Sequence, residues 1–263
     1  MKNIMKSILY EVLHSKLLIR IYLLFILVQA FIGILNLDAF HPEQPTVSNM
    51  LADGGYIVYE FPLFVLALIV GTMVGEDYRD KVANYEVMSG HSRKSIFLAR
   101  SLMATFIAAF ACSVLAFIPM LAGSVFADWG NTLVLKDVVI RYLLMFFPFL
   151  RLAAFLTVIT FIIKNNYLVM AVGFGMMFVN SMLSEMLKNN ENFFISMFNL
   201  KLLTCFDGWN IYNVDPQSGV VYYNSFISSV SPKLVIGTIA VSLLMTAFYL
   251  FMGYALFRRD DLN

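Results

Sequence analysis

Charged residues are scarce in this chain of 263 residues. Asp, Glu, Lys and Arg together make up 13% of it, whereas hydrophobic residues make up 60%. A soluble domain is about a quarter charged and about half apolar. This composition argues against a soluble protein and indicates an integral membrane protein. The net charge is only +1, and no basic cluster of the kind that binds nucleic acid is present.

Residues and motifs that carry chemistry are also few. The two cysteines, Cys112 and Cys205, lie far apart and match no metal or redox spacing. The chain has no H-E-x-x-H, no G-x-S-x-G and no pair of carboxylates in the middle of an apolar run. It also lacks G-x-x-x-x-G-K-[ST], so that if it uses ATP another polypeptide must bind the nucleotide. We expect no catalytic residue, metal site or cofactor in this chain.

Long apolar runs are abundant and predict six transmembrane helices at about 17–37, 57–75, 96–126, 138–163, 167–187 and 234–257. About 20 helical residues cross a hydrocarbon core of about 30 Å. The third and fourth runs are longer, and Pro119 and Pro148 are expected kink points within them. We therefore predict an all-α integral membrane protein whose residues 1–263 form a single transmembrane domain.

Lys and Arg predict the orientation of these helices. If the N-terminus is inside, the inner segments hold most of the Lys and Arg, and the first outer loop, 38–56, holds none. This asymmetry favours cytoplasmic N- and C-termini. The last outer loop, 188–233, is then long, and it contains an apolar stretch at 193–203 that is too short to span. That stretch predicts a re-entrant or interfacial segment before the last span, and turn signals follow it at Asp207-Gly208, Asp215-Pro216 and Ser218-Gly219.

The N-terminal segment 1–16 is amphipathic. One helical face collects the apolar residues Ile4, Met5, Ile8, Leu9, Val12 and Leu13. This pattern is typical of a helix that lies in the membrane interface. The alternative is that the segment is simply the start of the first span.

The segment 77–90, between the second and third spans, is the most charged part of the chain. Its apolar residues Tyr78, Val82, Tyr85 and Met88 fall on one helical face, opposite Asp77, Asp80, Lys81 and Asn84. Gly90 is a suitable helix stop, and Ser92 is a suitable N-cap for the next helix. We predict a short cytoplasmic helix across the ends of two spans; a plain interfacial segment without a partner is the alternative.

Ionisable residues within the spans are rare. Arg151 and Glu60 lie at similar predicted depths. A charge at such a depth costs roughly 2.5–3.5 kcal/mol on insertion scales, so each should face protein or water. We predict a structural ion pair between Glu60 and Arg151; the alternative places Arg151 in a substrate path.

The segment after the second run resembles a known family, the permeases of type-2 (type V-like) ABC exporters. The resemblance rests on Glu76-Asp77, Tyr85-Glu86-Val87-Met88-Ser89-Gly90, Ser92-Arg93-Lys94 and Arg100. The ending Phe257-Arg258-Arg259-Asp260-Asp261-Leu262 also resembles that family's common finish after the last span. The interfacial helix, the six spans and the long last outer loop fit the same layout.

The resemblance implies that 77–90 is a coupling helix that docks on a separate ATPase subunit. The residues expected to contact it are Asp77, Asp80, Lys81, Asn84, Tyr85, Glu86 and Arg93. Two permease chains, identical or sister, and two ATPase chains would form the exporter in a bacterial plasma membrane, with ATP and Mg²⁺ on the ATPases. Peptide toxins, bacteriocins, lantibiotics or drugs are the implied cargo. An intramembrane enzyme and a non-transporting immunity or sensor protein remain alternatives.

Overall fold

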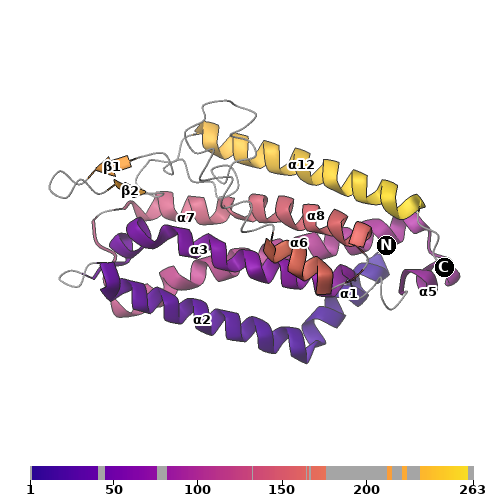
Figure 1. Ribbon diagram of the computed structural model, residues 1–263, viewed down its shortest axis with the longest axis horizontal. Helices are drawn as coiled ribbons and strands as arrows, with labels where there is room; N and C mark the ends of the chain where they lie inside the picture. The colour runs from indigo at the N-terminus through magenta and orange to yellow at the C-terminus, as the bar shows by residue number, and fades with distance from the viewer. Residues whose placement is uncertain are drawn as a thin grey trace.

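The computed structural model describes residues 2–40, 45–75, 82–131, 133–163, 165, 167–175, 212–214, 221–223 and 232–259. Its long helices lie side by side along the long axis of the molecule (Figure 1). In chain order the elements are α1 Lys2–His14, α2 Lys16–Phe40, α3 Val47–Val70, the π-helical turn η1 Gly71–Gly75, α5 Val82–Met88, α6 Arg93–Phe126, α7 Leu135–Leu144, α8 Phe146–Ile163, β1 Tyr212–Val214, β2 Val221–Tyr223 and α12 Pro232–Arg259. Residues 167–175 are also helical.

Four helical segments among the described residues are long and apolar enough to cross a membrane. They are Lys16–Leu37, Arg93–Phe126, Leu135–Ile163 and Val235–Arg258. These segments coincide with the first, third, fourth and sixth predicted runs, so the expected membrane class and these four helices are confirmed. The second run falls within α3 and η1, where Pro62–Gly75 is a shorter apolar helix. The fifth run is described only over 167–175, so the count of six spans stays a prediction.

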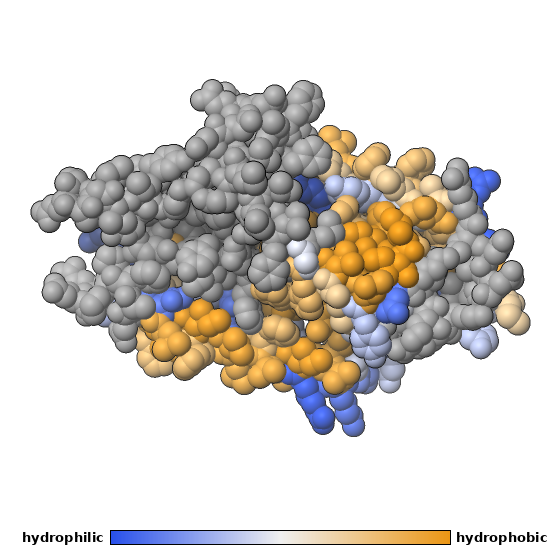
Figure 2. Space-filling view, viewed as in Figure 1, coloured by the Kyte–Doolittle hydropathy of each residue, from blue (hydrophilic) through white to orange (hydrophobic). Residues whose placement is uncertain are grey.

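Helix α6 forms the centre of the bundle, where it packs against α2, α3 and α8, while α12 packs mainly on α8. Small buried residues, among them Ala108 and Ala116, line its inner faces and let neighbouring helices approach closely. Gly33 of α2 shows how close: a Cβ there would lie 2.8 Å from Cα of Pro119 in α6. Figure 2 shows that the visible outer surface along α2 is mostly hydrophobic, as expected for a lipid-facing helix.

The two predicted kink points behave differently. The fourth run breaks at Met145, which separates α7 from α8, three residues before Pro148. The ring of Pro148 clashes with the carbonyl of residue 144 in a continuous helix and offers no N–H to it, which explains why α7 ends there. Pro119, in contrast, lies inside α6, which runs without interruption from Arg93 to Phe126.

The end of the bundle that contains the start of α3 and the loop 127–134 is called here the Trp129 end. The sequence predicted an outer loop over 38–56, and much of this segment is helical: α2 continues to Phe40 and α3 begins at Val47. The helix begins early because Thr46 Oγ1 accepts a hydrogen bond from Asn49 N. In addition, Val47 N and Ser48 N donate to the carbonyls of Asp128 and Trp129, at 3.0 and 2.9 Å.

A small hairpin departs from the all-α prediction. Strands β1 and β2 pair antiparallel, with Tyr212 opposite Tyr223 and Val214 opposite Val221. Both strands lie in the predicted loop 188–233. The segment between them, 215–220, contains Asp215-Pro216 and Ser218-Gly219, two of the turn signals found in the sequence. The predicted re-entrant stretch at 193–203 lies outside the described residues.

Candidate functional site at the α5 end

The opposite end of the bundle, called here the α5 end, contains α1, α5 and the first turns of α6 (Figure 1). Helix α5 ends in a compact turn at Gly90, whose φ of +91° lies in the left-handed region that glycine adopts readily. Gly90 N donates to Val87 O at 3.0 Å and His91 N donates to Glu86 O at 3.1 Å, the two bonds of a Schellman motif. The predicted helix stop is therefore confirmed.

Helix α6 begins immediately after this turn. The hydroxyl oxygen of Ser92 accepts a hydrogen bond from Ser95 N at 3.3 Å, which confirms the predicted N-cap. Only His91 and Ser92 separate the Gly90 turn from the first residue of α6, Arg93. Because this connection is short and each of its ends is capped, it fixes the orientation of α5 relative to α6.

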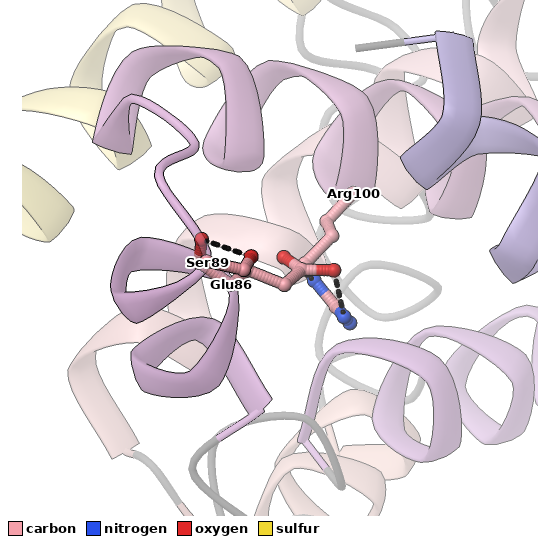
Figure 3. Close-up of polar contacts among 3 residues, drawn as sticks. All are labelled: Glu86, Ser89 and Arg100. Carbon is pink, nitrogen blue, oxygen red and sulfur yellow. Dashed lines mark hydrogen bonds and ion pairs between the residues drawn. The ribbon is translucent and has the colours of Figure 1, made fainter.

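An ion pair ties α5 to α6 (Figure 3). The guanidinium of Arg100 donates from Nε to Glu86 Oε2 at 3.0 Å and from Nη2 to Glu86 Oε1 at 2.9 Å. Both side chains are largely buried, with exposed fractions of 13% for Arg100 and 18% for Glu86. A bidentate pair has a defined geometry and is stronger than a single neutral hydrogen bond. Glu86 and Arg100 therefore hold α5 in one orientation against α6.

Helix α1 packs against the same part of α6. Ile4 and Ile8 are buried in a small cluster with Ile96 and Ala99 of α6. Val87 of α5 packs against this cluster, so that α1, α5 and α6 meet around it. Ser15 separates α1 from α2, and the two helices run in different directions (Figure 1). The N-terminal segment is thus a helix of its own and not the first turns of the first span.

The outward side of α5 is apolar. Tyr85 and Met88 are 69% and 81% exposed, while the inward side carries Glu86 and Val87. The periodicity of the sequence identified this apolar face but not the direction in which it points. A tethered helix that exposes a tyrosine and a methionine presents the residue types that are enriched in protein interfaces.

Several residues predicted to contact an ATPase cannot be compared with the structure. Asp77, Asp80 and Lys81 lie outside the described residues, and Asn84 lies in α5 without a described side chain. Their predicted role therefore stays a prediction.

The other predicted contact residues divide into two kinds. Tyr85 is exposed on α5, and Arg93 is exposed at the start of α6. Glu86, in contrast, directs its carboxylate to Arg100 of the same chain, which indicates a positioning role for Glu86. Met88, which is not one of the predicted contact residues, is exposed beside Tyr85.

The bundle buries several polar residues, among them Arg151 and Gln29. Arg151 of α8 is only 5% exposed, as expected for a charged residue in an apolar span, and the side chain of Glu60 lies outside the described residues, so their pairing stays a prediction. Gln29 of α2 is fully buried, and neither atom of its amide has a hydrogen-bond partner among the described residues. Gln29 is the one Asn or Gln in the apolar stretch 21–35, and this isolation is the signal in the sequence that could have identified it.

Within the described residues, no group of three or more His, Cys, Asp and Glu side chains lies close enough to hold a metal ion. In the described part of the α5 end, Tyr85 and Met88 are exposed, and the Glu86–Arg100 pair holds α5 against α6. No protein-family model matches the chain, and no curated protein sequence matches it.

Proposed function

We propose that this chain is the permease subunit of an ATP-driven exporter, in which α5 is the coupling helix that receives a separate ATPase. The observation that carries the proposal is the construction of α5: it is capped at Gly90, paired to α6 through Glu86 and Arg100, and apolar on its outward side. The resemblance to type-2 ABC exporter permeases, together with the lack of a P-loop in this chain, supports the same conclusion.

The packing of α6 suggests how force would pass from α5 into the membrane. Helix α6 has 34 residues, so at about 1.5 Å per residue it is about 51 Å long. It contacts α2, α3 and α8 along this length. A push on α5 is transmitted to α6 by the Glu86–Arg100 pair, and a tilt of α6 displaces three neighbours together. Closure of two ATPases would thereby rearrange the paths between the helices.

The proposed assembly has two permease chains, identical or sister, and two ATPase chains in a bacterial plasma membrane. ATP and Mg²⁺ bind only to the ATPases. The proposed topology has six spans, with both termini and the α5 end in the cytoplasm. The proposed cargo is an amphipathic or hydrophobic compound, such as a peptide toxin, a bacteriocin, a lantibiotic or a drug.

Co-purification tests the coupling role. The tagged full-length chain is isolated from its native host in a mild detergent, and the eluate is assayed for an ATPase chain and for ATP hydrolysis. We expect the unaltered chain to retain an ATPase and Tyr85→Ala with Met88→Ala to lose it. The matched control is Val125→Ala with Phe126→Ala, which removes equally exposed side chains at the other end of α6 and should retain the ATPase.

The outcomes separate the proposal from its alternatives. An ATPase that is retained equally by both double variants refutes the coupling role of α5. If no ATPase accompanies the unaltered chain, the non-transporting interpretation is favoured, whereas a hydrolytic activity of the isolated chain favours an intramembrane enzyme.

Accessibility to a membrane-impermeant maleimide tests the topology independently. In a background without Cys112 and Cys205, Lys136→Cys and Ser92→Cys place thiols at exposed positions at opposite ends of the bundle. We expect intact cells to label Lys136→Cys only, and permeabilised cells to label both. Labelling of Ser92→Cys in intact cells contradicts the proposed orientation.

A further inference from the structure

An apolar groove opens where α1 meets α2. It has a volume of about 300 Å³ and is lined by Leu13 of α1, Ile26 of α2, Ile69 of α3, Met73 of η1 and Ala111 of α6, with their apolar neighbours. This is about ten times the volume that a water molecule occupies in the liquid, roughly 30 Å³. Tyr22 also lines the groove, and its hydroxyl donates a hydrogen bond to Ala111 O at 2.9 Å. The lining therefore suits hydrocarbon and not water.

The groove has the dimensions of one membrane leaflet. Along α2 it extends from Leu18 to Ile26, which is about 12 Å at 1.5 Å per residue. Half of a hydrocarbon core of about 30 Å is about 15 Å. The groove begins at the elbow between α1 and α2, where an interfacial α1 meets the first span. An occupant that enters at this elbow thus has its apolar part within a single leaflet.

Basic residues mark the headgroup end of the groove. Lys16 and Arg20 are exposed and lie in the chain among the lining residues Leu13, Leu18 and Ile19, and hydrophilic side chains project from the elbow beside the hydrophobic surface of α2 (Figure 2). Lys16 and Arg20 carry two positive charges, whereas α1 contributes one acidic residue, Glu11. Long basic side chains at this depth reach toward the headgroups and attract anionic lipids.

From this geometry we propose that the groove holds one acyl chain of an anionic phospholipid, whose headgroup is bound by Lys16 and Arg20. The bound chain fills the space between the α1–α2 elbow and the walls formed by α3 and α6. The lipid thereby stabilises the angle between α1 and α2. This inference requires that the chain spans a membrane, but not that it transports anything.

Native mass spectrometry of the full-length chain tests the proposal. The protein is purified in a mild detergent and equilibrated with equal amounts of phosphatidylglycerol and phosphatidylcholine. We expect one retained phospholipid per chain, with phosphatidylglycerol preferred. Each basic residue near a membrane surface contributes a factor of about five to this preference. Lys16→Gln and Arg20→Gln should each lower it by about that factor, while Lys136→Gln, an exposed lysine at the other end of the bundle, should not.

Filling the groove tests the acyl-chain part. Ala111→Phe should abolish the retained lipid, whereas Ala247→Phe, which adds the same ring at an exposed position of α12, should keep it. Leu68→Trp fills the groove from the α3 wall and replaces Ala111→Phe if that variant does not elute as a monodisperse species. Equal retention by the filled variants and Ala247→Phe overturns the proposal.

The headgroup part is decided on the unaltered chain, without any substitution. Equal binding of the two lipids overturns the role of Lys16 and Arg20. Retention of a different apolar compound in place of a phospholipid overturns the assignment of the occupant and points to cargo. Neither result depends on whether an ATPase binds α5, so failure of this inference is distinguishable from failure of the proposed function.

Discussion

At the Trp129 end the helices are joined by backbone hydrogen bonds, whereas at the α5 end they are joined by side chains. Val47 and Ser48 donate their backbone N–H groups to the loop that follows α6. At the α5 end, the Glu86–Arg100 pair and the cluster around Ile4 and Ile8 make the corresponding contacts. Both ends therefore fix the angle between helices, but with different kinds of interaction.

This difference determines the free energy needed to separate the elements at each end. A buried backbone hydrogen bond has no alternative partner in an apolar surrounding, so breaking it costs the full desolvation of two groups. Glu86 and Arg100 are also largely buried, but they remain 18% and 13% exposed, so that water can replace a lost partner there. We therefore expect the contacts at the Trp129 end to resist separation more than those at the α5 end. The following predictions test this contrast, from the largest expected effect to the smallest.

Gly130→Ala should cause the largest loss of stability. Gly130 has a φ of +82°, and a Cβ there would lie 2.6 Å from Ser48 Oγ. Backbone strain and steric overlap together should cost about 4 kcal/mol, measured by thermal unfolding in detergent. The control is Gly237→Ala in α12, where an added Cβ meets nothing within 4 Å. Equal stability of the two variants would show that the close contact between Gly130 and Ser48 does not hold the Trp129 end together.

Loss of either member of the Glu86–Arg100 pair should have an intermediate effect. Glu86→Gln or Arg100→Gln removes the two charge-assisted hydrogen bonds of this pair and should cost about 2 kcal/mol. Hydrogen exchange should rise in α5 and remain unchanged in α3 near Thr46. The exchanged pair, Glu86→Arg with Arg100→Glu, should recover part of the loss in a double-mutant cycle. An unchanged exchange rate in α5 contradicts the role of the pair as its tether.

Gly90→Ala should cost less than Gly130→Ala, although both glycines have positive φ. An added Cβ at Gly90 meets nothing within 4 Å, so only the backbone conformation is strained, at about 1–2 kcal/mol. Gly90→Asn should recover part of this loss, because asparagine tolerates the left-handed region. Thermal unfolding compares the three variants. If Gly90→Ala lowers stability as much as Gly130→Ala, the steric overlap at Gly130 does not contribute to the loss.

The sequence predicted the elements of this fold that depend on local patterns. Long apolar runs identified four helices, and short-range chemistry identified the stop at Gly90 and the cap at Ser92. Pro148 identified the break between α7 and α8. Proline lacks the backbone N–H that would bond to a carbonyl one turn earlier in the same helix, so its effect is local. These features are determined by residues close together in the chain, and a single sequence is sufficient for them.

Features that depend on distant partners could not be predicted in the same way. The left-handed conformation of Gly130 follows from the pairing of its loop with Val47 and Ser48, about 80 residues earlier. Periodicity placed Tyr85 and Met88 on one face of α5, but the Arg100 side chain that turns this face outward belongs to another helix. Hydropathy missed the first turns of α3, since it responds to apolar content and not to the hydrogen bonds that start a helix.

The smallest effects are expected at two N-caps that form the same bond at opposite ends. Thr46 and Ser92 each accept a backbone hydrogen bond at 3.3 Å. Thr46→Ala should cost about 1 kcal/mol and Ser92→Ala about 0.5 kcal/mol. Thr46 costs more because its side chain also lies against Gly130, whereas Ser92 is exposed to solvent.

Thermal unfolding of the two alanine variants measures this difference, with Thr46→Ser and Ser92→Thr as controls that keep each cap. The Thr46→Ser and Ser92→Thr controls measure the contribution of the threonine methyl at each position, so that the remaining difference in stability reports on the surroundings of each cap. A larger loss at Ser92 than at Thr46 would mean that the α5 end is the more tightly held of the two. In that case side chains would hold the α5 end at least as firmly as backbone hydrogen bonds hold the Trp129 end.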